Sequence, residues 1–132
     1  MNGELLELES VPGFKQAVGQ LLRLTFPQNA DPALHWWRRE QRNAAAEIDF
    51  VFAHGARVVP VEVKAGAAGS LKSLHVFMSE RSLPWAVRVN SAPPVVQSVD
   101  VGTSIGARAS YRLLSVPAYL TEELPRLLDG MV

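Results

Sequence analysis

Three ionisable residues, Asp49, Glu62 and Lys64, fall in a segment where apolar and polar residues alternate. A period of two is typical of β-strands. The segment divides into residues 47–52 and 57–64 around a short turn. It therefore predicts a β-hairpin that carries the three ionisable side chains on one face. The opposite face is expected to carry the apolar set Ile48, Phe50, Phe52, Val59, Val61 and Val63.

The register of this hairpin decides how close the two carboxylates lie. A two-residue loop at residues 55–56 would place Asp49 directly across from Glu62. Directly opposed side chains have Cβ atoms about 4.5–5.5 Å apart, so two carboxylates repel unless a positive charge lies beside them. The ammonium group of Lys64 and a divalent cation are the two candidates. A bulge at Pro60, which has no N–H, would shift this register by one residue.

A solvated surface would explain the same charged face without any function. The residues that follow favour a functional interpretation, because residues 65–69 are rich in glycine and alanine and residues 71–81 have helical spacing, with Ser70 as the expected N-cap. A strand that enters such a crossover connection tends to lie inside a sheet, where charges are not casually exposed.

The rest of the chain predicts further elements on both sides of the hairpin. We expect a helix of about thirteen residues between Gly13 and Pro27 and a strand over residues 34–40. After the crossover helix we expect strands over residues 84–90, 95–101 and 111–116, and a final helix over residues 117–128 that Pro125 interrupts. The first of these strands is expected to lie parallel to the strand of Glu62. This order predicts one α/β domain over residues 1–132, with a mixed sheet flanked by helices.

Composition excludes several classes of protein. Thirteen basic and thirteen acidic side chains cancel, so no global field attracts nucleic acid, and the absence of cysteine excludes disulfides and thiolate metal sites. The N-terminus is acidic, and no apolar run reaches membrane-spanning length, so we expect a cytoplasmic protein without a membrane partner. Nucleic acid would need a local surface, for which the expected residues are Arg38, Arg39 and Arg42, beside two tryptophans, and Lys72.

Asp49 followed across a hairpin by Glu62-Val63-Lys64 resembles the PD-(D/E)XK nuclease superfamily. The resemblance implies a restriction-endonuclease-like α-β-β-β-α-β core with an added C-terminal strand and helix. It also implies that Asp49 and Glu62 bind Mg²⁺ or Mn²⁺ beside the carbonyl of Val63. In such a site Lys64 assists the water that attacks a phosphodiester.

Longer stretches are similar to the nuclease-like domain at the C-terminus of many prokaryotic AAA-type ATPases. They are residues 14–22, 37–40, 46–51, 60–66, 69–74 and 114–120. Members of that group usually carry a glutamate where this chain has Lys15, so a third carboxylate is missing. The ATPase part is expected to be absent, which implies a stand-alone domain or a remnant, with an AAA-type ATPase encoded separately as a candidate partner.

Two functions remain open from the sequence. One is a Mg²⁺-dependent nuclease in which Asp49, Glu62 and Lys64 are catalytic. The other is a catalytically inactive module that binds DNA or protein and accompanies an ATPase. The intact trio favours the first, and Lys15 favours the second, because a cation beside the site competes with metal.

Overall fold

A single mixed sheet organises the chain. The computed structural model describes residues 13–25, 35–39, 46–64 and 71–131. Their six strands follow the spatial order β1-β2-β3-β4-β6-β5. The strands are β1 (His35–Arg39), β2 (Ala46–His54), β3 (Arg57–Val63), β4 (Trp85–Asn90), β5 (Val95–Gly102) and β6 (Arg108–Pro117). Strands β1 to β3 form an antiparallel meander, β4 runs parallel to both β3 and β6, and β5 pairs antiparallel with β6. The predicted α/β class is confirmed.

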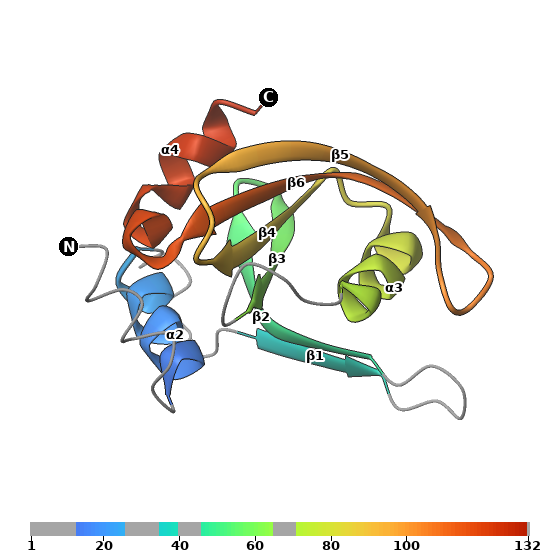
Figure 1. Cartoon of the computed structure of the whole chain (residues 1–132), viewed down its shortest axis with the longest axis horizontal. Coiled ribbons are helices and arrows are strands. Elements are labelled where there is room, and N and C mark those ends of the chain that lie inside the picture. The colour runs from blue at the N-terminus through green and yellow to red at the C-terminus, as the bar shows by residue number, and fades with distance from the viewer. Residues whose placement is uncertain (1–12, 26–34, 40–45, 65–70, 132) are drawn as a thin grey trace.

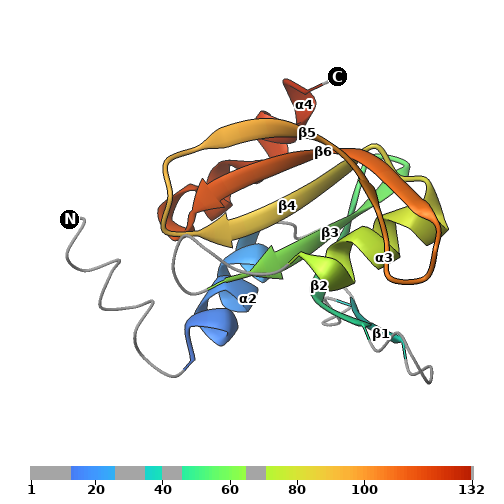
Figure 2. The same ribbon diagram turned by 45° about the vertical axis from the view of Figure 1, so that its right-hand side comes forward.

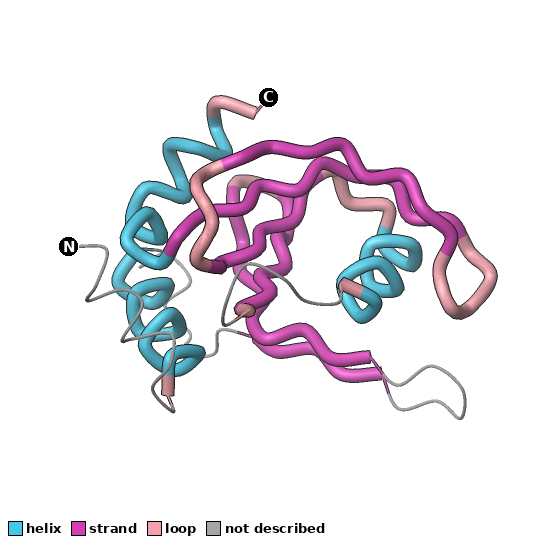
Figure 3. Tube along the Cα trace, viewed as in Figure 1, coloured by secondary structure: helices cyan, strands magenta, loops and turns pink. Residues whose placement is uncertain are grey.

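Helices cover both faces of this sheet. Figures 1 and 2 show α2 (Phe14–Thr25) and α4 (Leu124–Asp129) on one side and α3 (Lys72–Arg81) on the other. The 3₁₀ helix η1 (Ala118–Glu123) leads directly into α4. In Figure 3 the β5–β6 hairpin extends beyond α3. None of the described helices combines the length and the apolar character that a membrane crossing requires.

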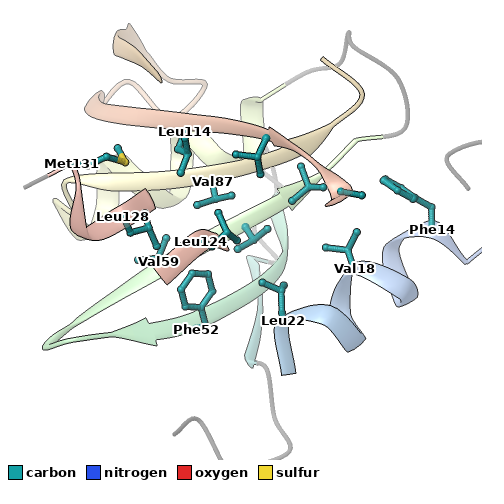
Figure 4. Packing of buried hydrophobic residues seen from close by; sticks show 14 residues of the cluster. Phe14, Val18, Leu22, Phe52, Val59, Val87, Leu114, Leu124, Leu128 and Met131 are labelled. Atoms are coloured by element: carbon teal, nitrogen blue, oxygen red, sulfur yellow. The ribbon is translucent and has the colours of Figure 1, made fainter. Parts of the chain in front are cut away.

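Each face of the sheet has its own apolar core. The first core lies under α2 and α4 (Figure 4) and includes Val18, Leu22, Phe52, Val59, Val61, Val87, Leu114, Leu124 and Leu128. The second core lies under α3 and includes Ile48, Val51, Leu74, Phe77, Ala86, Tyr111 and Leu113. Adjacent residues such as Leu113 and Leu114 thus fill different cores, as the period of a strand requires.

The β2–β3 hairpin forms with the predicted two-residue turn. His54 pairs with Arg57 across Gly55 and Ala56, and Gly55 has the positive φ of 63° that such turns favour. The paired register continues to Phe50 and Val61. No bulge occurs in this pairing near Pro60.

A bulge occurs on the other side of β2 instead. His35 pairs with Val51 and Trp37 with Ile48, so two residues of β2, Asp49 and Phe50, lie opposite one residue of β1. Such an extra residue changes which face the following side chains take. The expectation that Ile48 shares a face with Phe50 and Phe52 was therefore wrong: Ile48 joins Val51 in the second core, while the two phenylalanines pack in the first.

The starts of α3 and α4 can be compared with the helix boundaries expected from the sequence. The N-cap of α3 is Leu71, with no capping side chain, so the expected N-cap at Ser70 was wrong. Pro125 does divide the final helix as expected. It occupies the first turn of α4, where its missing N–H costs no hydrogen bond, and the preceding turns are 3₁₀.

Candidate functional site

Asp49 lies at the bulge, where the pairing of β2 with β3 ends. The paired register ends at Phe50 and Val61, one step before the predicted pair of Asp49 and Glu62. Beyond Phe50 and Val61, the Asp49 side chain contacts the backbone of β3: its Oδ2 accepts a 2.8 Å hydrogen bond from the N–H of Val63. The bulge therefore directs this carboxylate back across β3, and only 11% of its side chain is exposed.

Glu62 is a buried carboxyl group with an incomplete set of partners. Its Oε1 lies 3.4 Å from Nζ of Lys64, whereas its Oε2 is buried without a hydrogen-bond partner. The neighbouring Asp49 carboxylate offers only acceptor oxygens unless a proton lies between the two groups. A buried polar atom left without a partner is costly. A proton or a bound cation would relieve that cost.

The pKa of Glu62 reflects the same environment. Burial, followed by the charge of Asp49, raises the pKa of Glu62 to about 7, and the ammonium group of Lys64 opposes this increase. Glu62 thus exchanges its proton near neutral pH. Near neutral pH, a cation that binds beside Glu62 therefore competes with the proton on the Glu62 carboxyl group.

Lys15 reaches this cluster from the first helix, as expected. Its Nζ lies 3.2 Å from Oδ1 of Asp49, and the charge of Asp49 is the main cause that raises the pKa of Lys15. The helix comes close to β2 because Gly19 has no side chain: a Cβ there would lie 2.8 Å from the ring of Phe50. Close packing next to the bulge therefore sets the position of the Lys15–Asp49 ion pair.

The donor set fits a weakly held hard cation. Two carboxylates converge, but two lysines lie beside them, and oxygen ligands with several retained waters are what Mg²⁺ prefers. Within the described ranges no three His, Asp or Glu side chains gather as a metal site. Val63 contributes its N–H to the cluster, and the role of its carbonyl as a ligand stays a prediction.

Three of the four residues expected to contact nucleic acid lie in described elements. Arg38 and Arg39 lie in β1, where Arg38 pairs with Glu47 and Arg39 with Ala46. Lys72 is exposed at the start of α3. Arg42 lies outside the described residues. Their binding role stays a prediction.

Two polar residues of the same sheet were not predicted as functional. Arg88 on β4 donates from Nε to Oγ of Ser115, a fully buried serine on β6. In sequence, the two are separated by 27 residues. A single charged residue in an apolar strand, Trp85–Asn90, was the only signal for this pair.

Comparison with known proteins places most of this region in one family. Residues 14–97 match the family described as Domain of unknown function (DUF4143). The chain belongs to this family. The DUF4143 match includes α2, the hairpin with Asp49, Glu62 and Lys64, α3 and β4, whereas β6, η1 and α4 lie beyond it. No curated protein and no solved structure matches the chain.

Proposed function

We propose that this DUF4143 domain is a Mg²⁺- or Mn²⁺-dependent nuclease of the PD-(D/E)XK type that acts on nucleic acid phosphodiesters. The observation that carries the proposal is the unpartnered buried oxygen of Glu62, with the Asp49 carboxylate beside it and Lys64 at its other oxygen. A proton or a cation between the two carboxyl groups would satisfy such a pair. Asp49 and Glu62 would hold the cation, together with the carbonyl of Val63.

The residues of the chain supply orientation and charge for this reaction. The Val63 N–H fixes Asp49 through Oδ2, and burial holds Glu62 in place. When bound, a divalent cation supplies Lewis acidity that polarises a phosphodiester and makes water a stronger nucleophile at neutral pH. The Lys64 side chain is 30% exposed, so its ammonium group meets both the carboxylates and the solvent from which water attacks. Its charge stabilises the negative charge that develops in the transition state.

Lys15 sets a limit on cation affinity without closing the site. Its side chain is 47% exposed, and ion pairs of such exposed groups contribute about 0–1 kcal/mol. A divalent cation can displace an ammonium group from so weak an ion pair. We expect metal affinity to be modest for this reason.

The Lys15–Asp49 ion pair also favours a second candidate function, an inactive binding module. With Lys15 on Asp49 and Lys64 on Glu62, each carboxylate has a protein cation. The fold would then serve DNA or protein binding beside a separately encoded AAA-type ATPase. In that case the lysines stabilise the fold and have no chemical role.

Cleavage and melting, followed together, separate the two candidates. Wild type, Asp49→Ala and Lys64→Ala are incubated with single- and double-stranded DNA and Mg²⁺ or Mn²⁺. A nuclease should cut in a metal-dependent manner, lose activity in Asp49→Ala, and slow about 10²–10³-fold in Lys64→Ala while metal binding persists. Arg126→Ala, which removes an exposed arginine on α4, is the matched control and should cut like wild type. Wild type that cuts nothing, while Lys64→Ala melts lower, would leave the binding module as the function.

A further inference from the structure

Arg88 lies one strand away from Glu62 on the same face of the sheet. In the parallel pairing, Glu62 pairs with Arg88, and Arg88 pairs in turn with Ser115 of β6. The flanking pairs, Val61 with Val87 and Val63 with Val89, fill the first core, so alternation places the three polar residues on the α3 face. Neighbouring strands are about 4.8 Å apart. The backbone of Arg88 is therefore one strand from Glu62, but its guanidinium leans the other way, over β6 and β5, where Ser115 and Gln97 lie.

Neutral partners hold this guanidinium. Its Nε donates to Oγ of Ser115 at 3.0 Å, and its Nη2 lies 3.5 Å from Oε1 of Gln97. Because Ser115 is fully buried, its hydroxyl fixes the plane of the guanidinium against the sheet. An arginine side chain has five N–H donors in a rigid fork. At least three therefore remain for a ligand.

The charge of Arg88 is not neutralised within the described part of the chain. Arg108 and Arg126 each pair with a carboxylate, at 2.7 Å from Asp100 and 3.0 Å from Glu123, whereas Arg88 forms no such ion pair with any residue that the structure describes. Glu62 is its in-register neighbour, yet that carboxylate pairs with Lys64 instead. A half-buried cation held by neutral acceptors keeps its full charge for an external anion.

We propose that Arg88 binds a phosphate group of the nucleic acid backbone, on the same face of the sheet as Glu62. The inference rests on the proposed function for its substrate class, and it names a residue that positions this substrate. A phosphate presents two oxygens that match the guanidinium fork, an arrangement that lysine does not reproduce. A contact over β6 and β5 lies on the opposite side of β4 from Glu62, so it would hold a phosphate further along the nucleic acid strand and align that strand across this face without touching the cation.

DNA binding without metal tests this residue apart from catalysis. Fluorescence anisotropy with a labelled single-stranded oligonucleotide, in EDTA and over a series of salt concentrations, measures both affinity and its salt dependence. Arg88→Gln should bind about tenfold more weakly or worse, and the slope of log K against log salt should fall by about 0.7, the value for one phosphate contact on a single strand. Arg88→Lys should keep most of the slope and lose affinity, because the charge stays and the fork is gone.

Arg126→Gln is the matched control, since it removes the same charge from α4 on the other side of the sheet. Circular dichroism verifies that each variant is folded. Weaker binding with a reduced slope in Arg88→Gln supports the inference even if wild type proves unable to cut DNA, in which case only the nuclease proposal fails. Equal affinity and slope for Arg88→Gln and wild type would overturn the inference whatever the cleavage result. No binding of the oligonucleotide by wild type would overturn it as well.

Discussion

The ammonium group of Lys15 and a divalent cation compete for the same carboxylate, because Nζ of Lys15 already lies 3.2 Å from Oδ1 of Asp49. Lys15→Glu removes the repelling charge and adds a ligand-competent one. Two unit charges about 4 Å apart interact by about 1 kcal/mol in water and about 4 kcal/mol near a protein surface. We therefore expect Mn²⁺ affinity to rise about tenfold or more, measured by isothermal titration calorimetry.

Arg23→Glu provides the control for Lys15→Glu. It makes the same change of charge on the same helix, in its last turn. A similar gain in both variants would indicate a general charge effect instead of a local one, and unchanged affinity in Lys15→Glu would show that Asp49 is not a ligand.

Glu62 makes the stability of the metal-free protein depend on pH. Its pKa is raised from 4.5 to about 7 in the folded protein, so the folded state retains a proton that the unfolded state has lost. The stabilisation is fully present below pH 4.5 and is lost as pH rises through 7. The free energy of unfolding should fall by about 1–3 kcal/mol between pH 5 and pH 8. Urea unfolding in EDTA measures it.

Glu62→Gln is the comparison for this pH dependence, because the amide keeps the shape and cannot titrate. Its unfolding free energy should vary less over the same interval. The other ionisable groups of the cluster, Asp49, Lys64 and Lys15, are unchanged in the variant. Parallel curves for the two proteins would show that the buried carboxyl does not titrate near neutral pH.

The sequence predicted part of this cluster because its geometry is local. A two-residue turn fixes the register of the hairpin as far as Phe50 and Val61, one step from Asp49 and Glu62, and alternation places Lys64 on the face of Glu62. Arg88 and Ser115 were not predicted, because their contact depends on the order in which β4 and β6 join the sheet. Nothing in either strand's own pattern contains that order.

Among the elements, β2 shows where pattern analysis is correct and where it fails. The first and last residues of β2 and its pairing with β3 follow from the alternation of apolar and polar residues and from the turn at Gly55. Its bulge does not, since β1 pairs with it through a separate register, and the side chain of Ile48 takes the opposite face as a result. The same bulge places Asp49 beside Val63 and Glu62. The feature that alternation missed is the one that assembles the candidate site.

Helix α2 provides a second case of local pattern and distant contact. The expected helix of about thirteen residues is close to the 12 observed, and its buried side includes Phe14, Val18 and Leu22. The distance between this helix and the sheet depends on the contact of Gly19 with Phe50, two residues that are 31 positions apart in sequence. Sequence periodicity gives the face of a helix but not how closely that face approaches its partner.

The molecule as a whole extends beyond the part that matches DUF4143. Strand β6 lies between β4 and β5, inside the sheet, although it begins after residue 97. Residues from this later part enter both cores: Leu114, Val116, Leu124, Leu128 and Met131 in the first, and Ala109, Tyr111 and Leu113 in the second. The proposed phosphate contact also depends on it, because Ser115 holds Arg88. The cooperative unit is therefore larger than the family match.

A chain that ends at Gln97 tests this directly. It keeps all of the DUF4143 match and loses β6, η1 and α4, so β4 becomes an exposed edge and both cores lose buried leucines. Burial of apolar area is the main force that offsets chain entropy, and removing a single buried leucine side chain costs about 2–5 kcal/mol. We expect the shortened chain to show no cooperative thermal transition by circular dichroism. The 132-residue chain, and its Arg126→Ala variant, should unfold in one transition that coincides with the change in tryptophan fluorescence. A sharp transition in the shortened chain would show that residues 98–132 are an addition to an independently stable domain.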